Sequence, residues 1–113
     1  MKKIASRLAG FGVTALVLMV AIQASGYVGA AAITVALSAL GPGGILGGIG
    51  TLGVIGLVTQ ALAEFGLEAI FSAVVGELIR RGETKETILT KIERYPISGS
   101  LKRKLREQVS LCR

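Results

Sequence analysis

The chain has 113 residues, 51% of them hydrophobic, and a formal net charge of +6. It contains no His and no Asp, which excludes Ser-His-Asp and Cys-His catalytic devices and removes the commonest zinc ligand. No Gly-Lys-Ser/Thr follows the glycine-rich segment, which excludes a Walker-type phosphate loop. We therefore expect no enzyme, no cofactor and no metal site. The single cysteine, Cys112, cannot form an internal disulfide, and we expect an exposed thiol.

Charge is absent from Leu8 to Ala63, a run of 56 residues. About 20 apolar residues suffice to cross the hydrocarbon core of a bilayer, whereas a small soluble domain needs charge on every surface helix. The sequence therefore predicts an integral membrane protein. Basic residues on both sides of the run (Lys2, Lys3 and Arg7 before it, the tail from Gly82 after it) place both termini on the cytoplasmic side. That topology requires an even number of crossings.

The first segment allows two interpretations. Its basic start and apolar continuation resemble a signal peptide cleaved after Ala24, although Ile22 is bulky for the position it would occupy before the cut. The apolar sequence also continues through Leu40 rather than becoming polar. As one helix, Leu8–Leu40 would be about 50 Å long, more than the ~30 Å hydrocarbon core, so we expect a break near Gly26 and Gly29.

The clearest turn signal is Gly41-Pro42-Gly43-Gly44, where proline ends a helix and glycine accepts positive φ. A second helix is expected from Ile45 to about Arg81, antiparallel to the first. The crossing segments of this hairpin would be Ser25–Leu40 and Ile45–Ala63.

The apolar stretch Leu8–Ile22 would then form a third helix, at the interface or packed on Phe65–Val75. In the alternative, Leu8–Ala24 crosses separately and the rest forms shorter helices. Either way, residues 1–81 make up a hydrophobic membrane domain.

Residues 82–113 have a different character and predict a short, basic, amphipathic helical hairpin in the cytoplasm. Thr84 is a plausible N-cap for the first helix, and Pro96 ends it. Ser98 or Ser100 can cap the second helix. The expected apolar faces are Ile88, Ile92 and Tyr95 on one helix, and Leu101, Leu105, Val109 and Cys112 on the other. So short a hairpin must lean on the membrane domain, a lipid surface or another subunit.

Closely spaced glycines follow the turn and suggest helix packing. Helices in lipid associate through close backbone contact at small residues. The set is Gly43, Gly44, Gly47, Gly48, Gly50, Gly53 and Gly56. These glycines either assemble a homo-oligomer or let two helices of one chain approach; a flexible, fusion-peptide-like segment is a third interpretation.

Polar residues recur at helical spacing at Gln60, Glu64 and Glu68. In a ring of subunits they would line an aqueous pore with an acidic mouth. In the simpler alternative, Glu64 marks the membrane boundary and pairs with a basic residue.

A dense basic cluster lies near the C-terminus, at Lys102, Arg103, Lys104 and Arg106. It would attract anionic lipid or dock on a protein partner. Nucleic acid is poorly supported, because Tyr95 is the only nearby stacking group. The cluster also fits a topology determinant on a solvated helix face.

The segment Leu37-Ser38-Ala39-Leu40-Gly41 ends an Ala-rich stretch and precedes glycine-containing segments. In this respect, residues 29–75 resemble the interferon-alpha-inducible family of small Gly/Ala-rich membrane proteins, whose Ala-rich helix ends in Leu-Ser-Ala-x-Gly. The composition is also similar to that of circular bacteriocins, which lack the C-terminal hairpin. Both resemblances imply a membrane-embedded helical protein, and the second also implies membrane damage.

Together these patterns predict an all-α integral membrane protein, built as a helical hairpin about the Gly-Pro-Gly-Gly turn with an appended amphipathic hairpin. The expected function is a self-associating protein that perturbs or permeabilises the bilayer, as a pore-forming toxin, a holin-like protein or a defence effector does. The alternative is a non-enzymatic accessory subunit that anchors a larger membrane complex through its tail.

Overall fold

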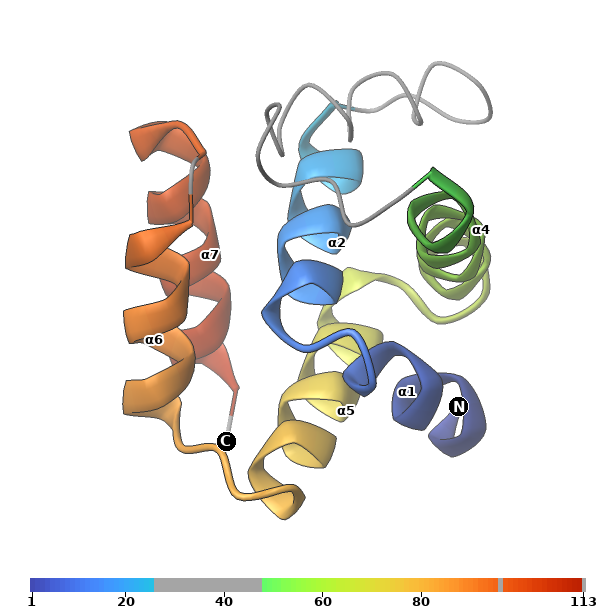
Figure 1. The fold of residues 1–113 in the computed structure, drawn as a ribbon, viewed down its shortest axis with the longest axis horizontal. Coiled ribbons are helices and arrows are strands. Elements are labelled where there is room, and N and C mark those ends of the chain that lie inside the picture. Colours follow the sequence, from blue (N-terminus) through green and yellow to red (C-terminus); the bar gives the residue numbers. More distant parts are fainter. Residues whose placement is uncertain (26–47, 96, 113) are drawn as a thin grey trace.

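The structure is a computed structural model that describes residues 1–25, 48–95 and 97–112. Over these ranges the chain forms helices and no strands, which confirms the all-α part of the expected fold class. The helices are α1 (Lys2–Ala9), α2 (Val13–Ser25), α4 (Gly48–Phe65), α5 (Leu67–Arg80), α6 (Lys85–Arg94) and α7 (Gly99–Leu111). They lie in three layers, with α6 and α7 on one side, α2 and α5 in the middle, and α4 and α1 on the other side (Figure 1).

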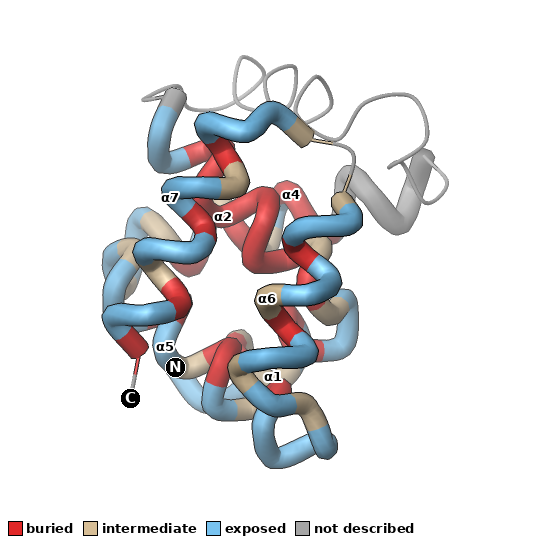
Figure 2. The backbone as a smooth tube through the Cα atoms, turned by 90° about the vertical axis from the view of Figure 1, so that its left-hand side faces the viewer, coloured by how far each residue is buried: buried red, intermediate tan, exposed pale blue. Residues whose placement is uncertain are grey.

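The central element is α2, which contacts each of the other five helices described. From Val13 to Ile22 every residue except Thr14 is buried, and the four residues from Leu16 to Met19 are fully shielded from solvent. A helix that is apolar on all sides must be enclosed on all sides, by protein or by lipid. Here the enclosure is protein, and the neighbouring helices turn their buried positions inward and their polar positions outward (Figure 2).

Glycines with positive φ divide the chain into short helices. Gly12 (φ 65°) lies in the bend between α1 and α2, and Gly66 (φ 83°) separates α4 from α5. L-residues with a Cβ disfavour this backbone conformation, whereas glycine accepts it readily. The expectation of one continuous helix from Ile45 to about Arg81 is therefore wrong, because Gly66 ends it. The turn at Gly41–Gly44 and the crossing segment Ser25–Leu40 fall largely outside the described residues.

The apolar N-terminal stretch packs on α5, in agreement with one of the two placements expected for Leu8–Ile22. It is not one helix, because α1 ends at Ala9. The guanidinium of Arg81, just beyond α5, fastens α1 by donating from Nη2 to the backbone oxygen of Ser6 (2.9 Å) and to its Oγ (3.2 Å). A cation at the C-terminal end of α1 also complements the helix dipole.

The C-terminal hairpin is confirmed, as are its predicted caps. Thr84 caps α6 by accepting from the backbone N–H of Thr87 (3.1 Å), and Ser98 caps α7 by accepting from that of Leu101 (3.2 Å). The expected apolar positions of α6 and α7 belong to the same buried cluster as α2, except Tyr95, which is partly buried and packs against it. Residues 82–113 and 1–81 therefore share a core. The turn between α5 and α6 contains Gly82 (φ 102°).

Cys112 is buried, which corrects the expectation of an exposed thiol. Its Sγ lies 3.5 Å from the Oγ of Ser72 on α5, and its backbone oxygen accepts a hydrogen bond from the Nζ of Lys85 on α6. These contacts seat the end of α7 against the two neighbouring helices.

Within the described ranges, no single helix has the length and apolar composition needed to cross a bilayer. The pair formed by α1 and α2 meets that test jointly, but its two parts meet at an angle of 113°.

Substituting Gly66 and Gly76 with alanine should have opposite effects on stability. A Cβ meets no atom within 4 Å at either position, so only backbone conformation differs. Gly66→Ala should lower the free energy of unfolding by about 1–2 kcal/mol, because alanine disfavours positive φ. Gly76→Ala, inside α5, should raise it by about 0.5–1 kcal/mol. Chemical denaturation followed by circular dichroism measures both; a loss at Gly76 equal to that at Gly66 would contradict the assigned joint.

Candidate functional site

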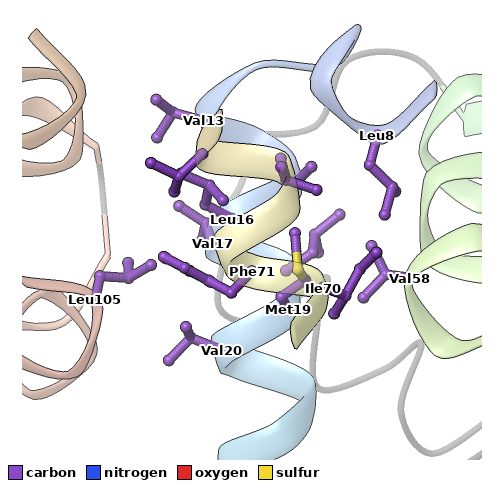
Figure 3. Packing of buried hydrophobic residues seen from close by; sticks show 14 of the residues in the cluster. Leu8, Val13, Leu16, Val17, Met19, Val20, Val58, Ile70, Phe71 and Leu105 are labelled. Atoms are coloured by element: carbon purple, nitrogen blue, oxygen red, sulfur yellow. The ribbon is translucent and has the colours of Figure 1, made fainter. Parts of the chain in front are cut away.

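The most distinctive site is the apolar environment of α2, because this helix carries no charged side chain. Figure 3 shows α2 and α5 side by side between α7 and α4. Leu105 reaches in from α7 and Val58 from α4, while Ile70 and Phe71 of α5 pack beside Met19; all are buried. These contacts are apolar on both sides and enclose α2 within the protein.

One polar contact crosses this core. The Oγ1 of Thr14, on α2, lies 2.7 Å from the hydroxyl of Tyr95, at the end of α6, in a partly buried hydrogen bond. A half-buried hydroxyl without a partner would carry a desolvation penalty, so each group specifies the position of the other. The bond fixes α2 against the C-terminal hairpin. Sequence reasoning missed it, although Thr14 is the only polar residue between Val13 and Ile22.

Part of the predicted glycine set lies within the described residues. Gly43, Gly44 and Gly47 lie outside the described residues, and Gly48, Gly50 and Gly53 lie on α4. Gly56 is exposed, and a Cβ built there meets nothing within 4 Å. Contact within one chain therefore does not require glycine at position 56. Its role in self-association stays a prediction.

The polar stripe is only partly brought together. Gln60, Glu64 and Glu68 are all exposed. Gln60 and Glu64 share α4, but Glu68 lies in the first turn of α5 beyond the Gly66 break. The three residues therefore do not form one stripe on a continuous helix. No ion pair is formed by Glu64 within the described residues, so the boundary pairing expected as an alternative is not seen.

The basic cluster on α7 is partly neutralised by α6. Glu93 accepts hydrogen bonds from two of its members, at its backbone oxygen from the Nζ of Lys102 (2.7 Å) and at its carboxylate from Arg106. Arg103 and Lys104 are exposed, and the carboxylate of Glu107 follows one helical turn later. A lipid or partner role for this cluster stays a prediction, carried by Arg103 and Lys104.

The described residues contain no group of three or more acidic or cysteine side chains that could hold a metal ion. Buried side-chain nitrogen and oxygen atoms in the described part of the chain all have hydrogen-bond partners. The site therefore offers no orphaned polar group that would point to a bound ligand.

Glu83, in the turn that leads into α6, forms an ion pair with Lys91 of that helix. Hydrogen bonds from Lys91 and Thr87 hold the pKa of its carboxyl below the ordinary value of 4.5. The carboxylate therefore stabilises the folded state above that pH, and this contribution is lost as the pH falls through the lowered pKa.

Replacing this carboxylate should make the stability of the fold depend less on pH in the acid range. Glu83→Gln should be less stable than the wild type at neutral pH, with the difference shrinking as the pH falls below 4.5. Glu107→Gln, which removes an exposed carboxylate, is the comparison. Thermal unfolding across pH measures both; a difference for Glu83→Gln that does not change with pH would contradict the assigned ion pair.

No protein-family model, no curated protein and no solved structure matches this chain. The resemblance of residues 29–75 to the interferon-alpha-inducible family therefore remains a prediction from the sequence.

Proposed function

We propose that this is a small, non-enzymatic, self-associating membrane protein that permeabilises bilayers, and that α2 is the helix it inserts. The observation that carries the proposal is the enclosure of α2, whose buried residues from Leu16 to Met19 are apolar on every side of the helix. Such a helix is solvated equally well by a protein core or by hydrocarbon. Moving α2 from the protein core into the bilayer therefore replaces one apolar environment with another.

The surrounding helices suit this exchange. Both α6 and α7 bury one apolar face and expose one polar face, so they can lie at a bilayer interface once they leave α2. Their release requires the hydrogen bond between Thr14 and Tyr95 to break. The closed fold would thus be a storage form, and the open form would be the active one.

Insertion also requires a change in the bend between α1 and α2. The 13 residues of α2 span about 20 Å, less than the ~30 Å hydrocarbon core. The α1–α2 pair becomes long enough only if its 113° bend opens. Gly12, with its positive φ, is the residue whose backbone must change.

The same proposal also assigns residues to self-association and to the lining of a pore. The exposed backbone at Gly56 is open to a second copy of the chain, and Gln60 and Glu64 on α4 would border any pore formed there. Both termini would lie on the cytoplasmic side. Cleavage after Ala24 would remove α1 and all but the last residue of α2, so the proposal requires the uncleaved chain.

Dye release from liposomes tests the function directly. The wild type should release dye, and Gly12→Ala should do so at about one tenth of the protein concentration, because about 1.4 kcal/mol less holds the bend closed. Gly66→Ala is the matched control, since it also places alanine at positive φ without clashes but leaves the α1–α2 bend intact. Equal gains in the two variants would contradict the hinge at Gly12. Failure of the wild type at any protein-to-lipid ratio would favour the accessory-subunit alternative.

Crosslinking in vesicles tests the assembly face. Gly56→Leu should reduce the crosslinked oligomer severalfold and leave insertion intact, because leucine fills a surface that only a partner would need open. Gly99→Leu is the control, since this glycine of α7 is also exposed and a Cβ there also meets nothing within 4 Å. An unchanged oligomer in Gly56→Leu would remove this face from the assembly.

A further inference from the structure

A second group of basic side chains lies on α1 and at the end of α5. Five exposed cations gather there: Lys2, Lys3, Arg7, Arg80 and Arg81. The carboxylate among them, Glu77, is bonded to Arg80 at 3.2 Å, which leaves a net charge of +4. The next carboxylate along the chain, Glu83, is bonded to Lys91 of α6. This basic surface, hereafter the α1–α5 face, was not expected from the sequence, because its two halves are far apart along the chain.

The α1–α5 face also carries apolar groups. Met1 and Phe11, at the two ends of α1, are 49% and 39% exposed and belong to the few large hydrophobic residues that the described surface exposes. Between α1 and α5 runs an open groove of about 450 Å³, lined by small residues such as Ala5, Ala73 and Gly76 as well as by charged ones. Cations interleaved with exposed apolar groups match a partner that is anionic at its surface and apolar beneath it.

We propose that the α1–α5 face docks on the surface of an anionic bilayer. Lys3 and Arg7, one turn apart on the outer side of α1, would contact phosphate groups, and Phe11 would enter the layer between head groups and acyl chains. Docking in this way brings the bend at Gly12 to the membrane. The inference rests on the proposed function and names the surface through which that function begins.

The rival location is the outer side of α7. Four cations of α7, Lys102, Arg103, Lys104 and Arg106, stand against two carboxylates. Glu93 is paired with Arg106 and Glu107 lies one turn from Arg103 and Lys104, so the local net charge is +2. The α1–α5 face therefore has the larger uncompensated charge. Nucleic acid would satisfy the cations but not the exposed Met1, and Phe11 is the one aromatic group on this face available for stacking.

Two double variants of equal charge separate these locations. Lys3→Gln/Arg7→Gln alters the α1–α5 face, and Arg103→Gln/Lys104→Gln alters α7. Each removes two exposed cations that have no side-chain partner within the described residues. The probes are vesicles of phosphatidylcholine alone and of an equimolar mixture with phosphatidylglycerol, with binding measured by co-sedimentation. Circular dichroism verifies that each variant is folded.

The wild type should bind the anionic vesicles more tightly than the neutral ones, and less tightly as salt is raised. Each cation near the surface contributes about fivefold, so Lys3→Gln/Arg7→Gln should bind about 25-fold more weakly, and Arg103→Gln/Lys104→Gln within about twofold of the wild type. Phe11→Ser should weaken the binding that persists at high salt.

Three results would overturn the proposal: equal losses in the two double variants, a larger loss in the α7 variant, or tighter binding to a single-stranded oligonucleotide than to anionic vesicles. Dye release recorded in the same samples tests permeabilisation separately from docking of the α1–α5 face. Vesicle binding without release would leave the α1–α5 face in place and reject permeabilisation. Release unaffected by Lys3→Gln/Arg7→Gln would reject this face and retain permeabilisation.

Discussion

The enclosure of α2 is the constraint from which the other packing relationships follow. Because this helix has no polar face, it must have neighbours on every side, and the described helices supply them as layers around it. Each surrounding helix then needs only one apolar face and can carry charge on the other. Among the described residues, the uncharged helix α2 therefore lies inside the fold, and the charged faces of α6 and α7 lie on its outside.

The short joints are what make this enclosure possible. A chain of 113 residues can surround a central helix only if it reverses direction often. Gly12, Gly66 and Gly82 lie in three of the joints between helices, where the backbone takes positive φ. These joints also limit helix length, which explains why α4 and α5 do not form one long membrane-crossing helix. The glycine joints that let the chain close around α2 therefore also keep the described helices short in the closed form.

Sequence reasoning succeeded where local chemistry decides the structure. The caps at Thr84 and Ser98 and the buried faces of α6 and α7 could be predicted because capping and helical periodicity involve residues close in the chain. It was wrong at Gly66, where a single glycine in an apolar run is compatible with either a continuing or a broken helix. It did not find the bond between Thr14 and Tyr95, or the groove that Lys2 and Arg80 line together, because both depend on tertiary packing. An uncharged segment has the same pattern whether protein or lipid surrounds it, so the sequence alone could not distinguish them.

The buried end of α7 gives the protein a chemical reporter of its own opening. The thiol of Cys112 lies against Ser72 and is shielded from solvent, and it is the single cysteine in the chain. An alkylating reagent can therefore reach it only when the end of α7 separates from α5, and the ratio of its labelling rate to that of a free thiol gives the fraction of molecules in which this has happened. Each tenfold slowing corresponds to about 1.4 kcal/mol of protection. The native chain thus allows the opening of its C-terminal hairpin to be followed, in solution or on a vesicle, without an introduced label site.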